Sequence, residues 1–114
     1  MFYNVNEIHT ENDALFSIKT IIADHVVDRP TANHMAEYWV ENNKDATVVV
    51  KDVCGLIIEC FSNYKFSLFV DDIFILEEDS YITVYERALV LDNAGTRYVE
   101  IRLSNDQKTL IKRL

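Results

Sequence analysis

Apolar residues near the start of the chain recur at the spacing of an α-helix. They are separated by three or four residues along one predicted face: Leu15, Ile18, Ile22 and Val26. Thr10 and Asp13 precede them with the hydroxyl and carboxylate spacing of a helix N-terminal capping box. The pattern predicts a helix over residues 11–26.

A second helical pattern follows Pro30, a residue type that suits the first turn of a helix and disfavours helical conformation at the position before it. Its apolar positions share one face: Ala32, Met35, Ala36, Trp39 and Val40. Asn42 and Asn43 are suited to a left-handed helix stop. We therefore expect a second helix that ends near Asn42.

After Asp45 the period of the pattern changes to two, and β-branched and aromatic residues dominate. The predicted strands lie near residues 46–51, 56–61, 66–70, 73–76, 81–91 and 97–103. A short final strand within residues 108–114 is a further candidate. Asp71-Asp72 lacks the glycine of a tight hairpin, so residues 66–76 form either two strands or one long kinked strand.

Two helices followed by strands, with no helical pattern between the strands, predict an α+β fold. We expect two N-terminal helices packed on one face of a mostly antiparallel, five- to six-stranded meander sheet. The length of 114 residues suits a single domain over residues 1–114, and no internal repeat is visible. In the last predicted strand, Tyr98, Glu100 and Arg102 alternate with the apolar positions, which indicates a polar face opposite the core.

The residue types that most enzyme sites need are missing from the chain. Gly55 and Gly95 are the only glycines, which argues against a glycine-rich phosphate loop. The two cysteines and three histidines lack the paired spacing of zinc ligands, and two thiols do not make a disulfide framework. We therefore expect no catalytic residues, no metal, no cofactor and no enzymatic activity.

The segment 1–7 has neither the basic start nor the apolar run of a secretory signal. No apolar stretch approaches the roughly 20 residues that cross a bilayer. The sequence therefore predicts a cytoplasmic protein that does not bind membranes through a spanning segment.

Charge is the most informative property of the composition. The formal net charge is −8, which disfavours direct binding to nucleic acid or to anionic lipid. Residues 1–79 carry 15 acidic and 5 basic side chains, whereas residues 80–114 carry 4 acidic and 6 basic ones. This asymmetry favours docking on a basic protein, because complementary potentials speed encounter and exclude wrong partners.

The expected partner-binding surface combines acidic groups with aromatic anchors. The acidic candidates bracket one apolar run: Asp71, Asp72, Glu77, Glu78 and Asp79. The aromatic candidates lie nearby in the sequence: Tyr64, Phe69 and Tyr81. Large aromatic side chains surrounded by charged groups are typical of interface hot spots.

These features predict a small acidic inhibitor, an immunity protein or antitoxin that binds and blocks a basic toxin, with a nuclease as the first candidate. A phage or mobile-element inhibitor of a host nuclease that mimics nucleic acid is a close alternative. A homo-oligomeric adaptor that pairs through the open sheet face or an edge strand at residues 97–103 is another. The last is a small enzyme or ligand binder with a pocket between helices and sheet, lined by residues such as Asp72, Tyr85, His34 or Glu59.

Overall fold

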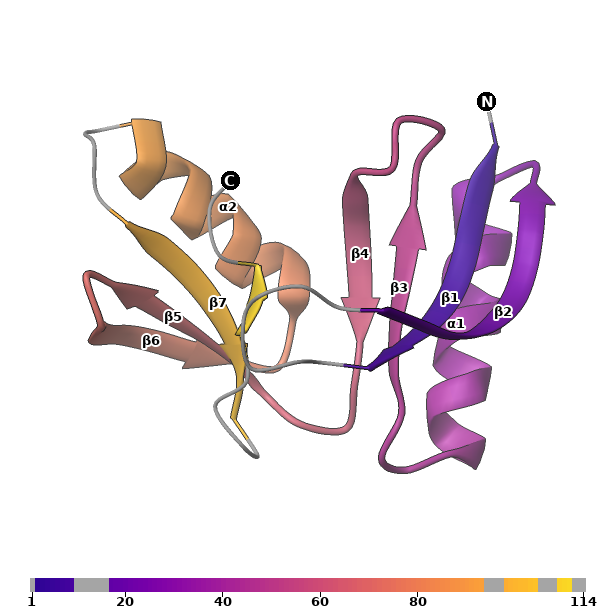
Figure 1. Ribbon diagram of the computed structural model, residues 1–114, viewed down its shortest axis with the longest axis horizontal. Coiled ribbons are helices and arrows are strands. Elements are labelled where there is room, and N and C mark those ends of the chain that lie inside the picture. Colours follow the sequence, from indigo (N-terminus) through magenta and orange to yellow (C-terminus); the bar gives the residue numbers. More distant parts are fainter. Residues whose placement is uncertain (1, 10–16, 94–97, 105–108, 112–114) are drawn as a thin grey trace. The chain divides into compact units, whose positions relative to one another are not determined.

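The chain forms two compact units in the computed structural model, which describes residues 2–9, 17–93, 98–104 and 109–111 (Figure 1). Unit 1 consists of the described residues up to Asn63, and unit 2 consists of those from Tyr64 onward. Both units have the same order of elements, which is two strands, one helix and two strands.

Unit 1 is a four-stranded antiparallel sheet covered on one face by a helix. Its elements are β1 (Tyr3–His9), β2 (Ser17–Val26), α1 (Arg29–Asn42), β3 (Thr47–Lys51) and β4 (Ile57–Phe61). The strand order is β2-β1-β3-β4. The core between α1 and the sheet consists of small and β-branched side chains: Val5, Val26, Ala32, Ala36, Val40, Ala46, Val48 and Val50.

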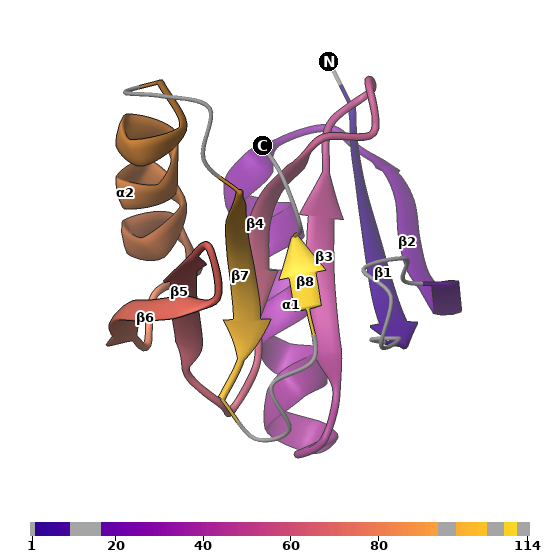
Figure 2. The same cartoon turned by 60° about the vertical axis from the view of Figure 1, so that its left-hand side comes forward.

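Unit 2 repeats this topology (Figure 2). Its elements are β5 (Phe66–Val70), β6 (Ile73–Glu78), α2 (Tyr81–Asn93), β7 (Val99–Leu103) and β8 (Thr109–Ile111), in the strand order β6-β5-β7-β8. The rings of Phe66 and Tyr81 meet edge to face at 5.7 Å, which places Phe66 on the face of the sheet toward α2. Alternation places Leu68 and Val70 on that same face.

The predicted fold class is therefore wrong in its architecture. The described residues form two antiparallel sheets with one helix each, in place of two N-terminal helices on a single meander sheet. The first helix follows the second strand, and β1 was not predicted at all. The repeat is one of topology, which the residue pattern did not reveal.

Residues 17–26 of the predicted first helix form strand β2, while residues 10–16 lie outside the described part of the chain. The pairing of β2 with β1 contains three register shifts, and each inserts an extra residue into β2. Such bulges break the two-residue period of a strand. Ile18 pairs with Ile8 on the face away from α1, whereas Ile22 and Val26 pack on the face toward α1, so their four-residue spacing does not mark a single face. The β-branched content of this segment favours a strand.

Residues 81–91, predicted as a strand, belong to helix α2. Tyr, Ile, Thr and Val are strand formers, but Tyr81, Val84 and Ala88 are buried at the spacing of one helix face. Ser80 caps the helix, because its hydroxyl accepts from the Thr83 N–H at 3.5 Å. Burial of that face outweighs the local strand propensity.

Asp71 and Asp72 form a two-residue hairpin turn, so residues 66–76 are two strands. Their φ angles are 51° and 64°, the pair of positive values that a type I′ turn requires. Aspartate tolerates this conformation better than most residues other than glycine. The turn is tied to Tyr98 by two hydrogen bonds, in which the Asp71 N–H donates at 2.9 Å and Asp71 Oδ1 accepts at 3.1 Å.

The predicted second helix is confirmed as α1. Asp28 is its N-cap, accepting from the backbone N–H of Thr31 at 2.9 Å and from the Thr31 hydroxyl at 2.8 Å. These bonds lower the pKa of the Asp28 carboxyl. Pro30 lies in the first turn, as expected. The predicted tail strand is confirmed over Thr109–Ile111, and neither helix among the described residues is long and apolar enough to span a membrane.

Candidate partner-binding surface

Strand β6 is an exposed apolar strand at the edge of the unit 2 sheet. Three consecutive side chains on it are solvent-accessible, with Ile73 66%, Phe74 55% and Ile75 40% exposed. Phe74 is paired with Phe69 and contacts its ring edge to face at 5.8 Å. Proteins usually protect edge strands against pairing with other chains, so a run of exposed apolar residues on such a strand indicates an interaction surface.

Acidic residues lie at both ends of β6, as the sequence predicted, but several of them form hydrogen bonds within unit 2. Asp71 holds the turn against Tyr98, and Asp72 Oδ1 accepts from Arg102 Nη2 at 2.8 Å. Glu77 Oε1 accepts from the Ser67 hydroxyl at 3.0 Å. Glu78 and Asp79 are exposed at the end of the strand, where a partner can reach them.

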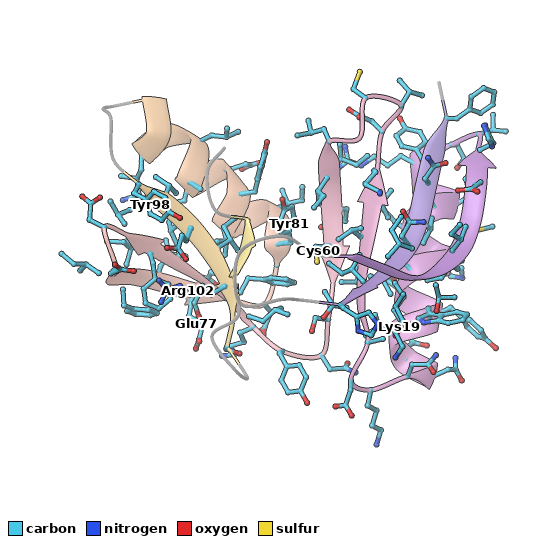
Figure 3. The ribbon with its side chains drawn as sticks, viewed as in Figure 1. Lys19, Cys60, Glu77, Tyr81, Tyr98 and Arg102 are labelled. Carbon is cyan, nitrogen blue, oxygen red and sulfur yellow. The ribbon has the colours of Figure 1, made fainter. Side chains whose placement is uncertain are left out.

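The three aromatic candidates have different environments, and Figure 3 labels Tyr81 and the Arg102 side chain in unit 2. Phe69 is half-buried on the sheet, and the guanidinium carbon of Arg102 lies 4.0 Å from its ring centroid. Tyr64 is half-buried at the start of unit 2. Tyr81 is only 1% exposed and stacks on Tyr85 at 5.6 Å, so its ring is part of the unit 2 interior and presents no surface.

A charged network occupies the face of the unit 2 sheet that α2 leaves open. Arg102 Nε donates to Glu100 Oε2 at 2.9 Å, and the same guanidinium binds Asp72 and covers Phe69. The hydrogen bond to Glu100 is the main reason that the pKa of Arg102 is raised. Glu100 is buried. The alternation of polar residues along β7 predicted a polar face, but it did not predict that Asp72 would bind Arg102 there.

The network fixes the shape of the β5–β6 hairpin. Asp72 comes from the turn, Phe69 from β5, and Glu100 and Arg102 from β7, so one guanidinium ties three parts of the sheet together. Charge-assisted hydrogen bonds of this length are stronger than neutral ones. Arg102 was not among the predicted site residues; it positions the turn at one end of β6.

Strand β7 lies between β5 and β8, so the predicted edge strand at residues 97–103 is not an edge where it is described. The residues suggested for a pocket are divided between the units, with Asp72 and Tyr85 in unit 2 and His34 and Glu59 in unit 1. Burial raises the pKa of Glu59, more than its hydrogen bond from the Cys60 N–H and the nearby Arg29 lower it.

The two cysteines have opposite environments. Cys60 is buried on β4, and burial raises the pKa of its thiol, so the unreactive thiol form persists at neutral pH. Cys54 is exposed in the loop between β3 and β4. Among the described residues, no group of three or more His, Cys, Asp or Glu side chains is arranged to hold a metal ion.

Comparison with protein-family models, with curated proteins and with solved structures gave no match.

Proposed function

We propose that this protein binds a basic partner protein and blocks its activity, in the way that an immunity protein or antitoxin blocks a toxin, with a nuclease as the first candidate partner. The observation that carries the proposal is β6, an exposed apolar edge strand that ends in exposed carboxylates. The net charge of −8 supports a partner of opposite sign.

The apolar part of β6 supplies the contact area. Removal of apolar surface from water stabilises a complex by about 25 cal/mol per Å², and large side chains in a central patch dominate most interfaces. Ile73, Phe74 and Ile75 form an apolar patch that includes both faces of the edge strand, which the turn and Arg102 hold in place. A preorganised patch binds with a smaller loss of conformational entropy.

The acidic part supplies encounter rate and selectivity. Glu78 and Asp79 are exposed, so their charges act mainly on the association rate and are screened by salt. Inhibition by this route requires no catalytic group in the inhibitor, because a protein that covers an active site blocks it sterically. The shortage of recognisable catalytic motifs supports this mode of action.

The test is affinity capture from a lysate of the native host at low salt, with two charge-reversal variants that change the net charge equally. Glu78→Lys acts at the end of β6, and Glu86→Lys acts on the exposed side of α2. We expect the wild type and Glu86→Lys to retain one basic protein and to inhibit it stoichiometrically. Glu78→Lys should weaken its binding at least about tenfold, a loss of about 1.4 kcal/mol.

Three outcomes contradict the proposal. They are a retained protein that is not basic, a retained protein whose activity is unchanged in the complex, and equal binding of the retained protein by the two variants. A salt series adds a further check, because binding that is unchanged between low and high salt removes the electrostatic contribution.

A further inference from the structure

We infer that the partner adds a strand to the unit 2 sheet along β6, through an extended segment with a short apolar run flanked by Lys or Arg at both ends. This inference rests on the proposed function, and it names the mode of binding and the chemistry of the partner segment. Strand addition of this kind draws affinity from main-chain hydrogen bonds and specificity from side chains.

Strand β6 has the form of an acceptor strand. It pairs only with β5, and as the last strand of its sheet it has one side of its backbone free of a neighbouring strand in the described part of the chain. It is six residues long, which is a typical strand length and spans about 20 Å. Its pairing with β5 contains a single register shift.

The other sheet edges among the described residues are less suitable. β8, at the opposite edge of the same sheet, has three residues, which leaves a short ladder. β2, at one edge of the unit 1 sheet, contains three bulges, and bulges disturb the regular spacing that a new strand needs. β4, at the other, has the same single register shift as β6, but its five side chains are buried or half-buried, so it offers little apolar surface to a new strand.

Both faces of β6 offer apolar contacts, which sets the centre of the partner segment. Phe74 pairs with Phe69 on the face away from α2, whereas Ile73 pairs with Val70, a residue of the face toward α2. A strand that lies beside β6 therefore meets apolar side chains on both of its faces. A strand that contacts apolar surface on both faces usually has a continuous run of apolar residues in its sequence. We therefore assign such a run to the centre of the partner segment.

The charges at the ends of β6 exclude a second copy of this chain as the added strand. Carboxylates lie at one end in Asp71 and Asp72 and at the other in Glu77, Glu78 and Asp79. Antiparallel or parallel pairing of two β6 strands brings acidic ends together, and like charges opposite each other are destabilising. The same arrangement attracts a segment with basic residues at both ends. Acidic residues at the ends of an apolar edge strand would thus disfavour self-association and favour a basic partner.

The test uses the full chain and a synthetic peptide of about nine residues, with the sequence Lys-Arg-Thr-Val-Ile-Val-Thr-Lys-Arg and blocked ends. Two matched peptides separate the contributions. One carries N-methyl groups at alternate central residues, which removes N–H donors and keeps the charge, and the other replaces the basic residues with Glu. Binding is measured by fluorescence anisotropy, and protection of residues 73–78 is measured by hydrogen exchange.

We expect the basic peptide to bind and to slow exchange of the β6 amides at least about fivefold, as added hydrogen bonds protect them. N-methylation and the Glu ends should each weaken binding at least about tenfold. Among protein variants, Ile73→Lys should weaken binding by a similar factor, whereas Val90→Lys should not. Ile73 is 66% exposed on β6 and Val90 is 60% exposed on α2, so the two changes match in exposure, charge and unit.

The outcomes separate this inference from the proposed function. Equal binding of the N-methylated peptide, or protection that appears away from β6, overturns strand addition while docking on a basic protein stands. Absence of peptide binding, together with capture of a basic protein that depends on Glu78, also overturns strand addition alone. Capture that is indifferent to Glu78 and to salt overturns the proposed function. Equal binding by the Ile73→Lys and Val90→Lys variants overturns the assignment to β6.

Discussion

Unit 1 and unit 2 share one topology but differ in the face of the sheet that their helix leaves open. In unit 1 that face carries the buried apolar residues Ile8, Val49 and Cys60, with the buried but uncharged Asn6 and Thr47 beside them. In unit 2 it carries Glu100 and Arg102, linked by a hydrogen bond. The topology therefore depends on the face toward the helix, which is mainly apolar in both units, with the buried Glu7, bonded to Trp39, as the exception in unit 1. The composition of the second face can vary.

The two second faces are stabilised by different interactions. Apolar burial in unit 1 is non-directional and tolerates changes of shape within limits. The network in unit 2 is directional, because a buried carboxylate is favourable only while its guanidinium partner is in place. The stability of unit 2 therefore depends more on a few directional contacts, and those contacts fix the geometry of the hairpin that carries β6.

The largest expected effect concerns whether the two units unfold together. Ile101→Ala removes a fully buried side chain from unit 2 and should lower the free energy of unfolding by about 2–5 kcal/mol. Trp39 is the only tryptophan and reports on unit 1. Each unit has fewer than about 60 residues and would be marginal alone, so we expect Trp39 fluorescence and far-UV circular dichroism to shift together in urea.

Val48→Ala in unit 1 is the reciprocal control, and it should also move both signals. An unchanged Trp39 midpoint in Ile101→Ala would show that the units unfold independently. That result would contradict the prediction of a single domain.

An intermediate effect is expected from the ion pairs of the two units. Arg102→Met leaves the buried Glu100 carboxylate without its guanidinium and should lower the free energy of unfolding by about 3–5 kcal/mol. Lys19→Met removes the ion pair with Glu7 in unit 1, which joins Nζ and Oε2 at 3.6 Å through a half-exposed lysine. That change should matter by less than about 1 kcal/mol.

Urea unfolding of both variants and of Arg102→Met with Glu100→Gln measures this difference. The double variant should recover part of the loss, since the buried negative charge that the guanidinium balanced is gone. Equal losses of unfolding free energy in Lys19→Met and Arg102→Met would contradict the expectation that the ion pair of unit 2 contributes more to stability than that of unit 1.

The smallest expected effect is the pH dependence of Glu59, a carboxyl of unit 1. Burial raises the pKa of Glu59 in the folded state, so its charged form opposes folding, and stability is lost as the pH rises through that pKa. Glu59→Gln should therefore increase the midpoint of thermal unfolding at pH 7. Below the unfolded pKa of about 4.3 it should change little, because both states are then protonated.

Glu41→Gln, the same substitution at an exposed position of α1, is the control and should have no comparable pH-dependent effect. A Glu59→Gln variant that is less stable at pH 7 than at pH 4, relative to wild type, contradicts the assignment.

Local patterns predicted the elements whose signals agree with one another. Helix α1 has a capping aspartate, a proline in its first turn and a regular apolar face, and it was found from these signals. Strands β3, β4 and β5 are rich in β-branched and aromatic residues, β7 alternates apolar with charged residues, and all four were also found. The predictions failed at β2, where apolar residues spaced by four lie on different faces of a bulged strand, and at α2, where strand-forming residues occupy a buried helix face.

The candidate surface was predicted in part. The acidic ends and the apolar run of β6 are adjacent in the sequence, but their exposure depends on β6 being the last strand of its sheet. Tyr81 is next to that run in the sequence and lies in the interior of unit 2, because the helix turns its ring toward Phe66. Strand order and helix orientation are non-local, so a window of neighbouring residues does not contain them.

The sequence by itself determined the negative charge, the acidic brackets around one apolar run, and the helix and strand segments with unmixed patterns. Only the tertiary structure decided that the chain divides into two units of the same topology, that β6 is an edge, and that Arg102 binds Asp72 across thirty positions of sequence. The physical reason is that propensity and alternation act between near neighbours, whereas sheet order and buried ion pairs are chosen by the packing of distant segments.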